Sequence, residues 1–436
     1  MNKTNVSNIA AEPQKTNFFK GVFSSLQYRN FALYFFGQVL SLSGTWVQNI
    51  AMSWLVYRLT NSVLLLATVT FLCLIPSLFI TPIAGVLSDR YNRYKILLTT
   101  QTIMMVQAFV LALLTITGLI EVWMILVISL LNGLVASVES PSRQAFYTRL
   151  VPREVMSNAV ALNSVTVNST RFIGPTIGGI LIAMVGEGYC FLVNGLSYIA
   201  VIACLLMMKI KSDAPRVREN RILQELKEGF MYIKGHVPIR SVLINAALIN
   251  FFCFPFLTVL PAFVKDILGG DSQMLGYAMS SVGAGSLMSA FYLAARKSVR
   301  GLGRVVSLAG IVFSVSLIMF TLFSSPLPAY ILCYVLGLTL VCVMASINTL
   351  LQTMVDDDKR GRVMSYFMMS MGLNPIGGML LGWLAQVITL PYALLVYGFI
   401  GLFSALIFEY RRPLVRKAAA ARIAEQDSAR NKVNPF

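Results

Sequence analysis

The chain has 436 residues, of which 57% are hydrophobic and only 12% are charged, and its mean hydropathy is +0.73. Soluble domains carry about 25% charged residues, so this composition excludes a soluble globular protein, a disordered chain and a disulfide scaffold. The 35 lysines and arginines outnumber the 18 acidic residues, but they lie in gaps between apolar runs, which indicates orientation in a membrane and not nucleic-acid binding.

The first 28 residues are polar, and no cleavable signal pattern precedes the first apolar run, so we expect that run to remain in the protein. A helix needs roughly 20 apolar residues to cross a bilayer core of about 30 Å. Twelve stretches meet this length, and they lack the alternating pattern of membrane β-strands, so we expect helices. The expected spans are 31–57, 62–87, 96–118, 122–145, 157–185, 189–208, 240–267, 274–295, 303–323, 327–352, 363–387 and 390–409.

The longest polar gap separates the first six spans from the last six. The expected fold class is therefore an all-α membrane protein with twelve transmembrane helices in two six-helix halves. Its expected parts are an N-terminal tail (1–28), a first half (29–208), a linker (209–239), a second half (240–410) and a basic C-terminal tail (411–436). Apolar residues at helical spacing in the linker predict an amphipathic helix, which lies either on the inner membrane face or in solvent. These residues are Ile222, Leu223, Leu226, Phe230 and Ile233.

Basic residues in the polar gaps predict the orientation. The loops after spans 2, 4, 8 and 10 hold thirteen lysines and arginines, whereas the gaps on the other side hold only Arg58 and Lys265. The positive-inside rule puts the first set of loops and both tails in the cytoplasm. We therefore expect a protein integral to the cell's inner membrane, with its basic C-terminal tail near anionic membrane lipids.

A short element recurs about 200 residues apart, near spans 5 and 11. The two copies are Gly174-Pro175-Thr176-Ile177-Gly178-Gly179 and Asn374-Pro375-Ile376-Gly377-Gly378. Together with the division into six and six spans, this repeat favours a duplicated transporter whose site lies between the halves. Gly174 and Pro175 remove a side chain and a hydrogen-bond donor within the span, which predicts a kink there.

Three charged residues of spans 4 and 5 are of particular interest. Glu139 and Arg143 lie one helical turn apart in span 4, and Arg171 lies roughly 20 Å into span 5 at 1.5 Å per residue. A charge at that depth must find a partner or a water-filled cavity. Burial favours the protonated form of a carboxyl group and a nearby arginine favours the ionised form. One hypothesis is that Glu139 carries a proton and Arg171 responds to its charge; the other is a permanent bridge from Glu139 to Arg143 or Arg171.

Polar residues share one helical face in span 1 and continue in spans 4 and 7. In spans 1 and 4 they line a cavity or form hydrogen bonds between helices, and the spacing leaves both interpretations open. In span 7, amides beside aromatic rings suit a bulky, partly apolar molecule, or they make ordinary packing and lipid contacts. The candidate cavity residues are Gln38, Ser41, Thr45, Asn49, Asn132, Asn250 and Phe254.

The loop after span 2 reads Gly85-Val86-Leu87-Ser88-Asp89-Arg90-Tyr91-Asn92-Arg93. It resembles the signature loop between helices 2 and 3 of the major facilitator superfamily, with Asn92 where that pattern has glycine. Because asparagine tolerates left-handed backbone angles, we expect the turn to survive. The resemblance implies that this loop, through Gly85, Asp89, Arg90 and Arg93, is a latch that stabilises the outward-open state; the alternative is a plain topological anchor.

Two further elements resemble parts of the superfamily. Gly174-Pro175 with Gly178 and Gly179 looks like the tail of the antiporter motif, although Thr170 stands where an upstream glycine is usual. The segments Leu260-Pro261, Leu268-Gly269-Gly270 and Gly283-Ala284-Gly285 are similar to the drug and siderophore exporter branch, which contains macrolide efflux pumps and the enterobactin exporter.

We therefore expect a secondary transporter that exports a drug, a macrolide-like compound or a siderophore by alternating access coupled to protons. A lysophospholipid or lipid flippase of the same fold and a non-transporting membrane protein are the alternatives. The sequence has no nucleotide-binding loop, so neither an enzyme nor an ATP-driven pump is expected. Six scattered cysteines and the one histidine, His236, predict no metal site or cofactor. The expected partners are a small organic substrate, protons and membrane lipids, with no nucleic acid, and the default state is a monomer.

Overall fold

The computed structural model describes residues 24–90, 92–209, 222–296, 298–356 and 358–433, and these residues contain helices and no β-strand. The first half comprises η1 (Ser24–Gln27), α2 (Arg29–Thr60), α3 (Val63–Arg90), α4 (Arg93–Ile116), α5 (Val122–Tyr147), η2 (Arg153–Val155), α6 (Met156–Val185) and α7 (Glu187–Leu206). The second half follows the linker helix α8 (Ile222–Gly235). It comprises α9 (Val237–Phe252), α10 (Phe256–Asp266), α11 (Ser272–Ala295), α12 (Leu302–Phe320), α13 (Pro326–Met354), α14 (Arg360–Met371), α15 (Asn374–Ile388) and α16 (Leu390–Val433).

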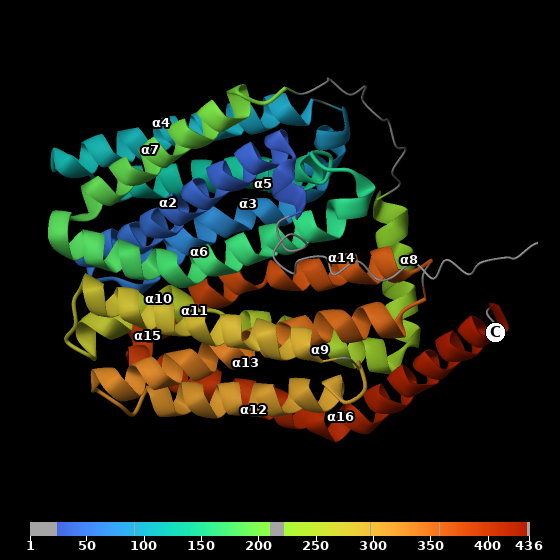
Figure 1. Ribbon diagram of the computed structural model, residues 1–436. Helices are drawn as coiled ribbons and strands as arrows, with labels where there is room; N and C mark the ends of the chain where they lie inside the picture. Colours follow the sequence, from blue (N-terminus) through green and yellow to red (C-terminus); the bar gives the residue numbers. More distant parts are fainter. Residues whose placement is uncertain (1–23, 91, 210–221, 297, 357, 434–436) are drawn as a thin grey trace, which may run out of the picture.

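The helices run roughly along one direction and form two layers, the blue-to-green first half above the yellow-to-red second half in Figure 1. Within the described residues, ten helical stretches are long and apolar enough to cross a membrane, with α9–α10 and α14–α15 each counted as one. Large apolar side chains such as Phe79, Phe291 and Phe403 are exposed on the bundle, as lipid-facing residues are. The expected total of twelve is reached only by adding α2 and α6. These two helices have 32 and 30 residues but carry many polar side chains.

Two expected spans are each divided into two helices. The span expected at 240–267 separates into α9 and α10 at Pro255, which cannot donate a backbone hydrogen bond and becomes the N-cap of α10. The span expected at 363–387 separates into α14 and α15 at Gly372, one turn before Pro375. By contrast, α6 continues without interruption through Pro175, so the kink predicted there does not break the helix.

The last helix is much longer than the span expected at 390–409. Helix α16 has 44 residues, which corresponds to about 66 Å, or twice the thickness of a bilayer core. The basic C-terminal residues therefore continue the helix instead of forming a separate tail. Figure 1 shows α16 extending beyond the bundle on the side where α8 lies. We call this side the linker end and the opposite side the far end.

The linker helix packs against the second half. Arg362 on α14 forms an ion pair with Glu228 on α8 at 2.6 Å. The carboxylate of Asp356, between α13 and α14, accepts a hydrogen bond from the Tyr232 hydroxyl at 3.0 Å and pairs with Arg422 of α16 at 2.6 Å. The sequence offered a membrane-surface helix or a solvated one. These contacts fix α8 to the second half, and its placement at the membrane face or in solvent stays a prediction. Its side chains at 222–226 lie outside the described residues.

The most extensive contacts between the halves are made by two pairs of helices: α6 packs along α11, and α3 packs along α15. Glycines allow the first pair to approach closely. A Cβ atom on Gly179 would lie 2.6 Å from the Ser272 carbonyl oxygen and 2.8 Å from the Cα of Gly276. Because real Cβ atoms essentially never come within 3.0 Å of another heavy atom, α6 and α11 could not pack this closely with a side chain at that position.

Candidate functional site

A cavity of about 450 Å³ lies within the first half, among α2, α3, α4 and α5, with Tyr198 of α7 at its wall. Five of the polar residues singled out in the sequence line it, together with Gln101, Glu139 and Arg143. The five are Gln38, Ser41, Thr45, Asn49 and Asn132. Apolar side chains, including Met52 and Leu66, complete the lining, so the cavity has the mixed surface that suits an organic molecule.

A buried ion pair forms one wall of this cavity. The Arg143 Nε lies 3.0 Å from the Glu139 Oε1, as expected for residues one helical turn apart on α5. Two amides hold the pair in place: Arg143 donates to the Gln38 side chain at 3.3 Å, and Gln101 donates to Glu139 at 3.5 Å. Only 8% of Glu139 is exposed. The pair therefore connects α2, α4 and α5 through one carboxylate and one guanidinium group.

Arg171 does not join this pair. Its guanidinium lies over the ring of Trp46 on α2, 6.0 Å from the ring centroid, and neither residue is among those that line the cavity. Arg143 forms the ion pair with Glu139 because both residues lie on α5. Arg171 lies on α6, which packs against α2, α7 and α11. Among the described residues, no carboxylate lies within 4.0 Å of Arg171. Within the part of the chain that the structure describes, the contact that compensates this cation midway along α6 is thus an aromatic ring.

The motif at 174–179 is a packing element for two neighbours. A Cβ on Gly174 would meet the Trp46 side chain at 2.5 Å, and one on Gly178 would lie 3.2 Å from the Cα of Val47, so both glycines seat α6 against α2. Gly179 faces the other half, across from Gly276. The sequence interpretation of Gly174 and Pro175 as a kink therefore missed the contact between halves that the last glycine allows.

Asn250 and Phe254 lie in the second half and do not line the cavity. The Asn250 amide donates to the Ala246 carbonyl at 2.9 Å and approaches the Ser370 hydroxyl at 3.5 Å, so it connects α9 with α14. Phe254 lies at the break between α9 and α10 and packs against the apolar core. Asn250 therefore makes packing contacts within the second half, in line with the packing alternative that the sequence left open for span 7.

The side chains of Gly85, Asp89 and Arg90, at the end of α3, lie outside the described residues. Arg93, which begins α4, donates to the Ala145 carbonyl near the end of α5 at 3.4 Å. Asn92 adopts φ −67° and not the left-handed conformation that the sequence suggested. Its side chain instead caps α4 by accepting hydrogen bonds from the backbone amides of Tyr94 at 3.0 Å and Lys95 at 3.4 Å.

Polar contacts join the two halves at the far end. The Tyr57 hydroxyl donates to Asp266 across the halves, and Lys265 donates to the Asn61 side chain at 2.7 Å. Lys265 also lies 5.3 Å from the centre of the Tyr57 ring. On the neighbouring helices, Gln386 of α15 donates to Ser62 at 3.2 Å. These contacts close the far end of the interface between the halves.

Sequence reasoning missed Gln101, Tyr198 and the far-end contacts. A glutamine in an apolar span was the available signal for Gln101, since such a residue rarely faces lipid. Tyr198 and Asp266 gave no comparable signal, because their partners are brought to them from helices distant in sequence.

Comparisons with known proteins agree with this architecture. The family model for transmembrane secretion effectors matches residues 20–434. The staphyloferrin A transporter of Staphylococcus aureus is 28% identical over 81% of this chain and 89% of its own length. The multi-drug resistance efflux pump PmrA of Streptococcus pneumoniae is 26% identical over 69% and 74%, respectively.

A solved structure of a POT family transporter in complex with a thioalcohol-conjugated peptide superimposes with a TM-score of 0.72. The match covers 89% of this chain and 96% of the POT family transporter. At 12% sequence identity, it shows a shared fold alone. The chain is thus an integral membrane transporter that belongs to the transmembrane secretion effector family of major facilitator proteins.

Proposed function

We propose that the protein is a proton-coupled exporter that moves a bulky organic molecule, of drug or siderophore type, across the inner membrane as a monomer. The observation that carries the proposal is the buried Glu139–Arg143 pair in the wall of a polar cavity of about 450 Å³. The names of its relatives, a siderophore transporter and a multi-drug efflux pump, favour this substrate range.

The distribution of basic residues supports an orientation with the linker end in the cytoplasm. In that orientation, the far-end contacts between Tyr57 and Asp266 and between Asn61 and Lys265 lie at the outer face. The chain then has its outer side closed, and transport requires these contacts to break while others form near the cytoplasm. The loop at Gly85, Asp89, Arg90 and Arg93 remains our candidate for the cytoplasmic latch of the outward-open state.

Competition between the substrate and a proton for the Glu139 carboxylate couples export to the proton gradient. A substrate group that donates a hydrogen bond, such as an ammonium or a hydroxyl, binds the ionised carboxylate from the cytoplasmic side. A proton arriving from outside neutralises the carboxylate, weakens that bond and releases the substrate outward. The proton then leaves toward the cytoplasm, and Arg143 favours this step because it stabilises the ionised carboxylate. One proton enters for each substrate released.

Arg171 adds a second requirement for the substrate. Its charge lies midway along α6 near the other half, and its one described partner is the ring of Trp46. An intramembrane cation without a carboxylate is a candidate binding group for an anion. We therefore propose that the substrate carries an acidic group that pairs with Arg171 when the chamber between the halves is occupied.

Reconstitution into proteoliposomes tests the proposal, with staphyloferrin A, erythromycin and a labelled lysophospholipid as probes under an imposed pH gradient. The wild type is expected to exchange protons for staphyloferrin A in preference to erythromycin, which carries no acidic group, and Glu139→Gln is expected to lose the pH dependence. Glu121→Gln, the same change at the exposed far end of α5, is the matched control.

Proton-driven accumulation by Glu139→Gln with the pH dependence of the wild type would refute the coupling. Movement of the lysophospholipid without a gradient, and of neither soluble probe, would instead establish the lipid flippase.

A further inference from the structure

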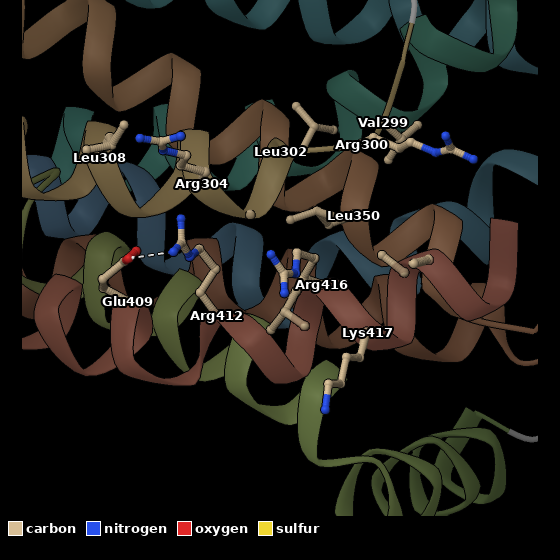
Figure 2. A pocket seen from close by; sticks show the side chains of 15 residues that line it. Val299, Arg300, Leu302, Arg304, Leu308, Leu350, Glu409, Arg412, Arg416 and Lys417 are labelled. Carbon is tan, nitrogen blue, oxygen red and sulfur yellow. Dashed lines mark ion pairs between the residues drawn. The ribbon is translucent and has the colours of Figure 1, made fainter.

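A second cavity, of about 780 Å³, lies in the other half at the linker end, apart from the cavity that holds Glu139. It is bounded by the loop before α12, the first turns of α12 and the part of α16 that follows its apolar span. Figure 2 shows the two walls, with Arg412 and Arg416 of α16 directed toward the space between the helices and Arg304 beside Leu308 on α12. Arg300 lies in the loop before α12, and Lys417 is directed away from α12.

The charge of this cavity is strongly unbalanced. Five basic side chains line it against one carboxylate, Glu409. That carboxylate is already engaged, because it pairs with Arg412 at 3.0 Å and accepts a hydrogen bond from Ser307 at 2.5 Å. For the other four cations, no carboxylate of the described chain lies within 4.0 Å. Within the described residues, the cavity thus has more cationic side chains than its one carboxylate can pair.

The floor of the cavity and the surface beside it are apolar. Leu302, Leu350 and Val415 are buried beneath the arginines. From the mouth of the cavity, α12 presents the exposed apolar residues Leu308, Val312, Val315 and Met319, which recur at helical spacing on one face. A charged pocket therefore continues directly into a stripe of the kind that faces lipid acyl chains.

We propose that this cavity binds the headgroup of an anionic phospholipid from the cytoplasmic leaflet, with its acyl chains along the stripe of α12. Guanidinium groups bind phosphate oxygens through paired hydrogen bonds, and basic pockets on the cytoplasmic side of membrane helices suit anionic headgroups. The volume lies within the range of about 300–1,000 Å³ that is typical of ligand sites. The apolar stripe favours a lipid over a free phosphate compound, because a soluble ligand would leave that stripe unused.

Native mass spectrometry of the purified full-length protein tests the proposal, with phosphatidylglycerol, phosphatidylcholine and glycerol phosphate as separate probes. The wild type is expected to retain one phosphatidylglycerol in preference to phosphatidylcholine. Removing two charges with Arg304→Gln and Arg416→Gln is expected to weaken retention roughly 30-fold, since each charge near a membrane surface contributes about fivefold. This pair leaves the Glu409–Arg412 contact in place.

The matched control is the pair Arg153→Gln and Arg411→Gln, two exposed arginines at the linker end that do not line the cavity. Equal retention of both lipids, or equal losses in the cavity variant and the control, would overturn the proposal. Displacement of the lipid by glycerol phosphate at submillimolar concentration would also overturn it and would assign the site to a soluble phosphate compound. The measurement does not depend on transport, so it stands apart from the proposed export.

Discussion

The close approach of α6 and α11 leads to a prediction about the equilibrium between the two faces of the transporter. In Gly179→Ala, the new Cβ would lie 2.6 Å from the Ser272 carbonyl oxygen, where ordinary contact begins at 3.4 Å. The helices must separate by about 0.8 Å at this point to accept the methyl group. Both neighbours on α11 are backbone atoms, so no side-chain rotation can relieve the contact.

The magnitude follows from the cost of overpacking, which is about 1–3 kcal/mol for an extra methylene in a well-packed region. The cost applies to the state in which the halves touch at Gly179, so it shifts the equilibrium toward opening of the far end by about 5-fold to 150-fold. Gly378→Ala is the control, because its Cβ would meet only the Thr258 hydroxyl, at 3.8 Å. Gly378 closes the corresponding motif of the second half, and both substitutions gain the same helix propensity, about 1 kcal/mol.

Double electron–electron resonance, which measures the distance between two spin labels, would report the opening of the far end. Labels at Leu119→Cys and Leu322→Cys mark exposed far-end loops of the two halves, in a background where the six native cysteines are replaced. We expect Gly179→Ala to increase the population at longer distance, while Gly378→Ala retains the parental distribution. An unchanged distribution in Gly179→Ala, or the same change in both variants, would show that this contact does not govern closure of the far end.

Three further predictions concern single side chains. Asn92→Ala should lower the free energy of unfolding by about 1 kcal/mol, because the side-chain cap of α4 is lost. Asn92→Asp should keep the cap and the stability of the wild type, and thermal unfolding in detergent would measure both variants. Tyr232→Phe removes the hydrogen bond to Asp356, worth roughly 0.5–1.5 kcal/mol, and should speed amide exchange in α8. Burial raises the pKa of Tyr232, so the bond should be fully present below its ordinary pKa of about 10 and lost as pH rises through the higher folded value. Arg171→Gln should abolish preference for an acidic substrate in the proteoliposome assay, whereas Arg171→Lys should retain most of it; wild-type selectivity in Arg171→Gln would exclude the proposed anion contact.

The helices and their order could be read from the sequence because apolar length is a local property. The breaks at Pro255 and Gly372 were harder to predict, since Pro175 and Pro413 lie within uninterrupted helices. A proline ends a helix only where the surrounding packing can satisfy the freed backbone groups. The length of α16 was underestimated for a related reason. Hydropathy predicts where a helix leaves the membrane but not where the helix ends.

The cavity residues could be predicted only in part. Gln38, Ser41, Thr45 and Asn49 share a helical face, and helical periodicity is readable from sequence. The choice of partner for Glu139 was not readable, because it depends on which face of α2 receives α6. The same limitation applies to the glycine motif, where composition suggests close packing but only the assembled fold shows that Gly179 faces the other half.

Asp356, between α13 and α14, connects the linker helix α8 with the last helix, α16. One oxygen of its carboxylate holds Tyr232 of the linker, and the other holds Arg422 of the last helix. In a chain that ends before position 422, Asp356 loses its ion pair with Arg422 and keeps only the hydrogen bond from Tyr232, among the contacts of the described residues. A truncation that removes Arg422 therefore also weakens the attachment of the linker between the halves.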